Sequence, residues 1–208
     1  MIKKVNQFET LTFGVQPRSS LVHTEDYKIY EFLNIKKYNA IIAGGCALSW
    51  YQHQPVGLKD IDLWFDTQDH LNEMSRFLSD YSFNRRAFQS ANAETWQCTA
   101  DNNKTYRIQL IKNYFYTDIH EVINNFDISV CQIATDGHTW YHGDQFCADL
   151  KEKRLRFIKN TPGSLKRLIK YWGYGFHPDD NTLHMIINNS QIKWDFSAET
   201  EEEYADAF

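Results

Sequence analysis

The chain has 208 residues, of which 42% are hydrophobic, 15% aromatic and 24% charged. This length and composition are those of a folded protein with one sizeable core, which excludes a large multidomain machine and a wholly disordered chain. No apolar stretch approaches the roughly 20 residues of a membrane span, and the first residues lack the apolar centre of a secretion signal. We therefore expect a cytoplasmic protein that has no membrane partner.

The net charge of −5 is distributed unevenly along the chain. Six of the 27 acidic residues fall within residues 195–208, which hold no basic residue, so the rest of the chain has 22 basic and 21 acidic residues. We interpret residues 195–208 as a flexible acidic tail through which a protein partner could bind. Residues 151–170 have the opposite bias, with eight basic side chains against the single acid Glu152. This basic segment is either an anion-binding surface or a solvated helix face.

The cysteines are far apart in sequence and include no C-x-x-C pair; they are Cys46, Cys98, Cys131 and Cys147. This spacing argues against a disulfide framework and against a cysteine-rich zinc site. We expect buried thiols.

The periodicity of apolar residues predicts alternating helices and strands up to about residue 142. In chain order the expected elements are a helix over 26–38, a strand over 39–43, a turn at Gly44 and Gly45, a helix over 46–53, a strand over 59–65, a helix over 68–81, and strands over 94–99, 106–112 and 126–134. Residues 138–142 are expected to close a hairpin through Asp136 and Gly137. The pattern predicts a mixed sheet that is antiparallel in part.

The C-terminal part of the chain has helical signals. Thr161 is expected to cap a helix that has Pro162 in its first turn and ends at Gly173, and a second helix is expected after Pro178. We therefore expect an α/β (α+β) domain over 1–150, a basic helical region over 151–194 and the acidic tail over 195–208.

Residues 43–65 contain the side chains that point to chemistry. Asp60 and Asp62 are two apart on a predicted strand, so their side chains leave the same face of the sheet. Two adjacent carboxylates repel one another unless a cation lies between them, and carboxylate oxygens are the ligands that Mg²⁺ prefers. The pair is either half of a metal site or two acids on an exposed face.

Two further features favour the metal site. Gly44 and Gly45 lie between a strand and a helix, where a backbone without side chains can approach a phosphate closely. Asp127 precedes a buried apolar run, where a carboxylate needs a partner or a cation. Together with Asp60 and Asp62, these residues suggest two-metal phosphoryl chemistry. Gln109 is expected to line the same cleft from a neighbouring strand, without a catalytic role.

This arrangement resembles the nucleotidyltransferase superfold of the polymerase-beta type. The matching residues are Ala43, Gly44, Gly45, Asp60, Ile61, Asp62, Leu63 and Asp127. The local sequences are similar to those of small phage and bacterial nucleotidyltransferases and, more distantly, to the head domains of poly(A) polymerases and CCA-adding enzymes. The resemblance implies a mixed sheet flanked by helices, followed by a helical C-terminal region.

The resemblance also implies an activity. A nucleoside triphosphate such as ATP would bind over Gly44 and Gly45, with Mg²⁺ or Mn²⁺ held by Asp60, Asp62 and Asp127, and a hydroxyl acceptor would attack the α-phosphorus and release pyrophosphate. The acceptor would be an RNA or tRNA end, a small molecule or a protein.

Further residues are assigned to the nucleotide by the same resemblance. Lys166, Arg167 and Lys170 on the predicted basic helix would pair with the triphosphate or with an RNA backbone, unless they form a solvated helix face. Cys46 stands where many relatives have a phosphate-binding Ser or Thr, so Ser49 would supply that hydroxyl from the next helical turn.

Two alternatives to an active enzyme stay open. One is an inactive module that binds nucleotide or nucleic acid through the basic segment. The other, which concerns context, is one member of a phage-defence or toxin–antitoxin pair.

Overall fold

The structure, a computed structural model, describes residues 33–52, 60–81, 85–99 and 104–189. Within these residues a seven-stranded sheet has the order β3-β4-β5-β2-β1-β6-β7. Its strands are β1 (Ala40–Ala43), β2 (Ile61–Phe65), β3 (Arg85–Gln89), β4 (Ala93–Thr99), β5 (Thr105–Phe115), β6 (Ile133–Thr135) and β7 (Trp140–His142). β2 and β5 are parallel, whereas the other neighbouring pairs are antiparallel. The sheet is therefore mixed, as the sequence predicted.

Helices pack on both faces of the sheet because its inner strands are apolar on both sides. On one face lie the 3-10 helix η1 (Ile35–Tyr38), α2 (Gly45–Tyr51) and α3 (Gln68–Asp80), whose apolar side chains share a core with Ile42 and Leu63. On the other face, α4 (Ile119–Asn125) packs against Ile41 and Ala43. Successive residues of β1 thus contact opposite layers, as the alternation of side chains along a strand requires.

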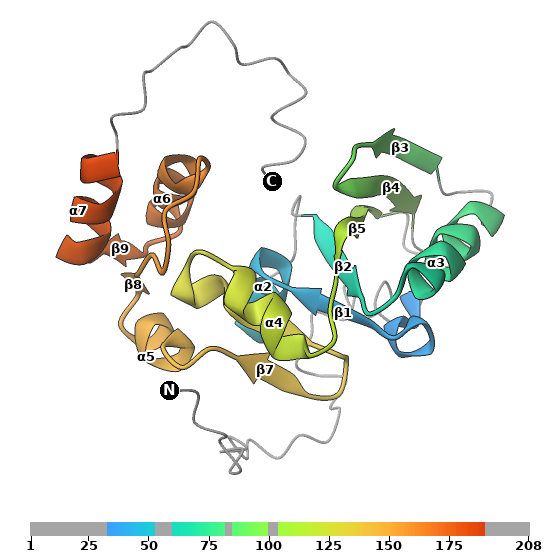
Figure 1. Cartoon of the computed structure of the whole chain (residues 1–208), viewed down its shortest axis with the longest axis horizontal. Helices are drawn as coiled ribbons and strands as arrows, with labels where there is room; N and C mark the ends of the chain where they lie inside the picture. The colour runs from blue at the N-terminus through green and yellow to red at the C-terminus, as the bar shows by residue number, and fades with distance from the viewer. Residues whose placement is uncertain (1–32, 53–59, 82–84, 100–103, 190–208) are drawn as a thin grey trace, which may run out of the picture.

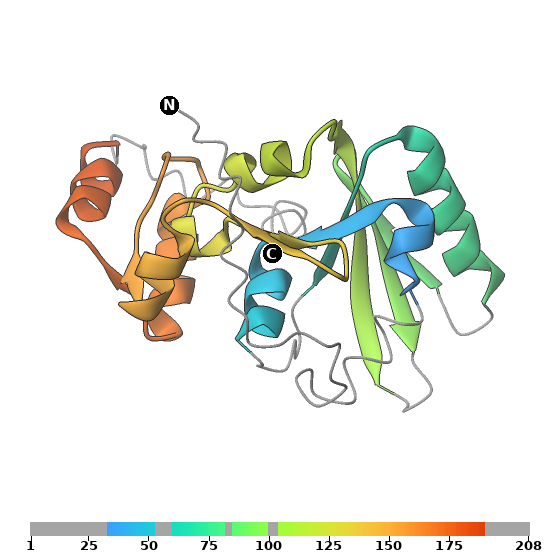
Figure 2. The ribbon, with the colours of Figure 1, turned by 90° about the horizontal axis from the view of Figure 1, so that it is seen from below.

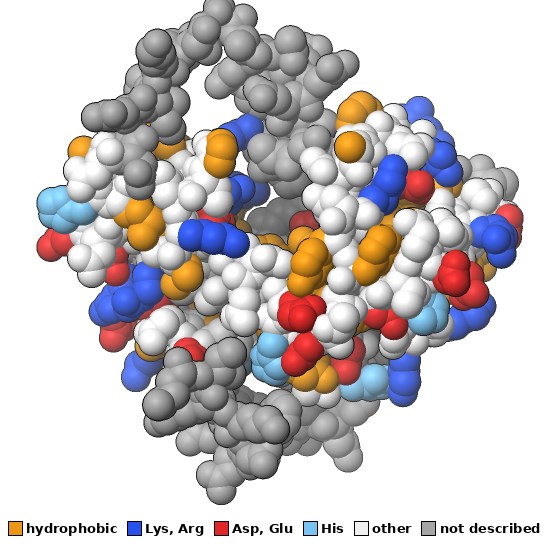
Figure 3. Space-filling view, in the orientation of Figure 1, with side chains coloured by type: hydrophobic (Ala, Val, Ile, Leu, Met, Phe, Trp, Pro, Cys, Tyr) orange, Lys and Arg blue, Asp and Glu red, His pale blue; other side chains and the backbone are white. Residues whose placement is uncertain are grey.

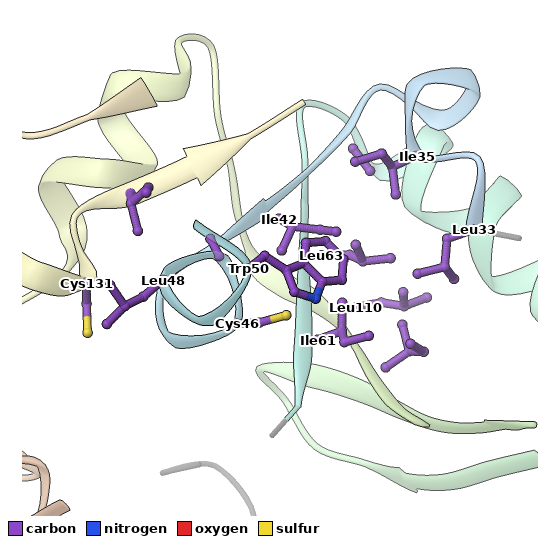
Figure 4. Close-up of a cluster of buried hydrophobic side chains, with 14 of the residues drawn as sticks. Leu33, Ile35, Ile42, Cys46, Leu48, Trp50, Ile61, Leu63, Leu110 and Cys131 are labelled. Atoms are coloured by element: carbon purple, nitrogen blue, oxygen red, sulfur yellow. The ribbon is translucent and has the colours of Figure 1, made fainter. Parts of the chain in front are cut away.

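The larger core joins α2 to the middle of the sheet. Figure 4 shows Trp50 and Cys46 of α2 pointing toward Ile61 and Leu63 of β2. These side chains are at most 6% exposed, so the core fixes β2 against α2. Because β1 and β2 are antiparallel, the end of β1, the turn into α2 and the start of β2 lie next to one another, where these two strands end and begin.

The C-terminal region shares this core. It contains α5 (Phe146–Lys151), β8 (Arg154–Leu155), α6 (Ser164–Gly173), β9 (His177–Pro178) and α7 (Asp180–Asn189), and β8 pairs with β9 in parallel. Leu155, Leu168, Tyr171 and Phe176 are buried in the same cluster as β2. Figures 1 and 2 place α6 and α7 at one end of the molecule and β3 to β5 at the other. The division into 1–150 and 151–194 stays a prediction, and residues 195–208 lie outside the described residues.

Two sequence predictions were wrong in detail. The strand expected over 126–134 is reduced to Ile133–Thr135, because Ser129–Cys131 form a 3-10 turn whose residues are all buried. A fully buried turn is as apolar as a buried strand, so the pattern could not separate them. The helix expected from Thr161 begins at Ser164 after Gly163, because the Thr161 hydroxyl bonds Asp127 instead of capping the helix.

Most of the remaining differences concern elements that are too short to be recognised in the sequence. The helix expected over 26–38 lies mostly outside the described residues, and its last part is the 3-10 helix η1. The elements that the sequence did not reveal are β3, α4, α5, β8 and β9. Each has only two to seven residues, too few for a period to show. No helix of the described residues is long and apolar enough to cross a membrane.

Candidate functional site

The turn between β1 and α2 requires glycine at position 44 and leaves little room for a side chain at position 45. Gly44 has φ 74° and ψ −138°, a backbone conformation that side chains disfavour. A Cβ atom built there would lie 2.6 Å from the Phe126 ring, and one at Gly45 would lie 3.1 Å from the Tyr171 hydroxyl. The turn is therefore packed between the loop at Phe126 and helix α6.

Asp60 and Asp62 lie beside this turn, at the start of β2. Asp60 is 7% exposed and Asp62 is half-buried. Among the described residues, none forms a hydrogen bond with either carboxylate oxygen of Asp60 or with the buried Oδ1 of Asp62. Buried carboxylate oxygens that lack hydrogen-bond donors are costly, unless a ligand from outside the chain satisfies them.

Burial governs the protonation of this carboxylate pair. It raises the pKa of Asp60, against the opposing effects of Arg107 and Lys170. Burial, together with the charge of Asp60, raises the pKa of Asp62 to about 8. A divalent cation would reverse this shift, because it stabilises the ionised form of both carboxylates.

Two cations face the pair from different elements. Nε of Arg107 on β5 lies 3.1 Å from Oδ1 of Asp60, an ion pair whose N–H does not point along a hydrogen bond. Lys170 on α6 is close enough to lower the pKa of both Asp60 and Asp62. Figure 3 shows the surface hollowed between α6 and the strands β3 to β5, with Lys or Arg side chains on the α6 side of the hollow.

Asp127 is bound to helix α6. Its Oδ2 accepts hydrogen bonds from Nε of Arg167 at 3.0 Å and from the hydroxyls of Thr161 and Ser164 at 3.2 and 3.3 Å, and Nη2 of Arg167 lies 2.8 Å away. In the described part of the chain, no three His, Cys, Asp or Glu side chains form a group that could hold a metal ion. The structure thus brings Asp60 and Asp62 together and gives Asp127 a different set of partners.

The other predicted nucleotide-binding residues lie on α2 and α6. Ser49 is 1% exposed and its hydroxyl donates a hydrogen bond to the carbonyl of Gly45 at 3.1 Å. Lys166, Arg167 and Lys170 are half-buried on α6 rather than on a fully solvated face. Contact of these residues with a nucleotide stays a prediction.

Sequence reasoning missed Arg107. In YRIQLIK the polar residues Arg107 and Gln109 alternate with apolar ones. This alternation indicates that the two share one face of a strand, but it does not indicate which strand lies beside them. The register of β2 and β5 pairs Ile61 with Ile108 and Asp62 with Gln109, and so supplies that information.

Comparison with known proteins gives both a family and a fold. A model of the "Gabija anti-defense 2 family protein" matches residues 17–153. Gabija anti-defense 2 of Bacillus phage SPbetaL7 is 26% identical over 159 residues, which cover 72% of this chain and 38% of that protein. The chain therefore spans well under half the length of this relative.

Solved structures with similar folds include CCA-adding enzymes. A CCA-adding enzyme in complex with CTP has a TM-score of 0.60 and 14% identity, over 78% of this chain and 43% of that one. The Thermotoga maritima CCA-adding enzyme in complex with tRNA has a TM-score of 0.58 and 15% identity, over 80% of this chain and 42% of that one. The likeness shows a nucleotidyltransferase fold, as the sequence predicted.

Proposed function

We propose that this chain, which belongs to the Gabija anti-defense 2 family, acts against the Gabija defence as a metal-dependent nucleotidyltransferase. The observation that carries the proposal is the pair Asp60 and Asp62, whose buried oxygens lack hydrogen-bond donors within the described residues. Carboxylate oxygens placed in this way fit a hard divalent cation such as Mg²⁺ or Mn²⁺. The sequence motif and the fold of the CCA-adding enzymes support the same reaction class.

In the proposed reaction, the oxygen of an acceptor hydroxyl forms a bond to the α-phosphorus of a nucleoside triphosphate. The bond from this phosphorus to the oxygen that bridges it to the β-phosphorus breaks, pyrophosphate leaves with the bonding electrons, and the hydroxyl releases its proton to water. Divalent cations, when bound, would lower the pKa of the acceptor hydroxyl and neutralise charge on the phosphates. Asp60 and Asp62 would hold them.

The remaining residues bind and orient the nucleotide. The phosphates would bind beside the Gly44–Gly45 turn, and Lys170 faces the carboxylate pair from α6, where it would contact the triphosphate. Arg167 acts mainly through Asp127: their ion pair fixes α6 and so the position of Lys170. Lys166 would complete the proposed nucleotide site, and Ser49 would support it through its hydrogen bond to the carbonyl of Gly45.

The direct test is transfer of label from α-labelled nucleoside triphosphates. The protein is incubated with each of the four triphosphates and Mg²⁺ or Mn²⁺, with RNA and protein from host cells as acceptors. Wild-type protein should transfer label, whereas Asp60→Asn/Asp62→Asn should not. Asp80→Asn makes the same chemical change at the exposed end of α3 and should retain transfer. Equal transfer by the double variant would refute the assignment of the carboxylate pair.

One observation favours a second candidate, a module that binds nucleotide without catalysis. Asp127, expected as a third metal ligand, is bonded to Arg167, Thr161 and Ser164. Two carboxylates suffice to bind one metal–nucleotide complex but leave the acceptor side with fewer ligands. Metal-dependent nucleotide binding without transfer to any acceptor would favour this second function.

A further inference from the structure

The sheet surface beside the carboxylate pair has two rows of side chains that run to its edge. Side chains of paired residues on neighbouring strands point to the same face, so the register of the strands defines each row. The first row starts from Asp60 and contains Arg107 of β5, Gln97 of β4 and Arg85 of β3. The second row starts from Asp62 and contains Gln109, Thr95 and Phe88 on the same three strands.

A β-bulge in β3 puts the last side chain of each row on the same face of the sheet. The register shifts between Arg86 and Phe88, so that Arg85 and Phe88, three residues apart, face the same side. Arg86 points to the opposite face, where its guanidinium lies 5.2 Å from the centre of the Trp96 ring and 3.8 Å from Glu94. The bulge therefore places a cation and an aromatic ring side by side at the sheet edge.

Both rows end in exposed side chains at the β3 edge, and the middle of the second row is buried. Gln109 and Thr95 are 6% and 5% exposed, whereas the side chain of Arg107 is 45% exposed and Phe88 is 40% exposed. Arg85 is also exposed, and its Nε donates a hydrogen bond to Oε1 of Gln97 at 2.7 Å. Figure 1 shows that β3 is the last strand on this side, beyond β4 and β5.

We propose that this two-row surface binds the acceptor of the reaction, and that the acceptor is a single-stranded nucleic acid. The inference rests on the proposed nucleotidyltransferase function and adds the substrate class. Arginine guanidinium groups bind phosphate oxygens, and an exposed aromatic ring on a sheet stacks an unpaired base. The exposed side chains of the rows supply both: Arg107 and Arg85 the guanidinium groups, and Phe88 the ring.

The geometry also orders the acceptor. Strands lie about 4.8 Å apart, so Arg85 and Phe88 on β3 are about 14 Å from the Asp60–Asp62 strand, since β5 and β4 lie between them. A terminal hydroxyl at the carboxylates would leave a preceding phosphate near Arg107 and an earlier nucleotide at Arg85 and Phe88. An acidic peptide would find the two arginines but would make no use of the aromatic ring.

The test measures binding of a fluorescently labelled eight-nucleotide RNA by anisotropy, in Mg²⁺ and over a range of salt concentrations. Phe88→Ala should weaken binding about tenfold, the effect of losing one stacked base. Arg85→Gln should weaken binding and lower the slope of log affinity against log salt by about 0.7, the effect of losing one phosphate contact. The matched control is Arg86→Gln, which changes the adjacent arginine on the opposite face. It should change neither the affinity for RNA nor the slope against salt.

The outcomes separate this inference from the proposed function. Binding of labelled triphosphate with Mg²⁺ is measured on the same proteins, because Arg85 and Phe88 lie away from the carboxylate pair and their variants should bind it as the wild type does. If wild-type protein binds triphosphate but no RNA, the inference fails, whereas the proposed function stands if the same protein transfers label to another acceptor. Equal losses in Arg85→Gln and Arg86→Gln, or Arg85-dependent binding of a polyglutamate peptide without RNA binding, would also overturn it.

Discussion

The carboxylate pair should make the metal-free protein less stable as the pH rises from 6 to 8. Burial and the neighbouring Asp60 raise the pKa of Asp62 from 3.8 to about 8, so the folded state holds a proton that the unfolded state has lost. A raised pKa contributes stability that is present at low pH and is lost as the pH rises toward its folded value. The perturbation is therefore a pH change in EDTA, followed by addition of Mg²⁺.

The size of the effect follows from the pKa. Each pH unit between the unfolded and folded values changes the free energy of unfolding by about 1.4 kcal/mol, and the change levels off near pH 8. Between pH 6 and pH 8 the loss is about 2 kcal/mol, which for a protein of this length lowers Tm by about 4–8 °C. Mg²⁺ should restore stability at pH 8, because it binds the ionised carboxylates.

Thermal unfolding of wild-type protein and of Asp62→Asn isolates this contribution. The chain has eight histidines that also titrate in this range, but they are the same in both proteins. The variant keeps a neutral side chain at all pH values, so its Tm should fall less between pH 6 and 8 and should respond weakly to Mg²⁺. An equal fall in Tm for both proteins would refute the assignment of a buried, proton-binding carboxylate at this position.

Three further predictions concern the elements around the site. Asp127→Ala should lower the free energy of unfolding by about 2 kcal/mol in urea titrations, because it leaves Arg167 without its buried partner. The double variant Arg167→Ala/Asp127→Ala should lose less stability than the two single variants added together. Gly44→Ala should cost about 2 kcal/mol or more in the same assay, since its Cβ would meet the Phe126 ring; an unchanged midpoint would contradict the packing of the turn. A thiol reagent should label one of the four cysteines quickly in the native protein, at the exposed Cys147, and all four in denaturant.

The carboxylate pair and the glycine turn were predictable from sequence because both are local. Asp60 and Asp62 are two residues apart, and the period of a strand alone places both on one face. The glycine turn is local too, since Gly44 and Gly45 separate a β-branched run from a helical one. These features needed no knowledge of the rest of the fold.

The rest of the site depends on pairings that the chain makes over long distances. Asp127 accepts its hydrogen bond from Arg167, 40 residues later, and Arg107 reaches Asp60 across the parallel pair of β2 and β5. Sequence periodicity gives the face on which a residue lies but not the strand or helix beside it. For this reason Asp127 was predicted as a metal ligand from its position before an apolar run, while its bond to α6 could not be foreseen.

The charges around the carboxylate pair explain how these long-range contacts would serve binding. Above about pH 8, where Asp60 and Asp62 are both ionised, they are balanced by Arg107 on β5 and by Lys170 on α6, so the site is then close to neutral without metal. A divalent cation would make it positive, which favours a triphosphate carrying several negative charges. The nucleotide should therefore bind much more weakly without metal. Because Asp127 and Arg167 hold α6 in place, breaking their ion pair should weaken nucleotide binding through the displaced Lys170 even when the metal is present.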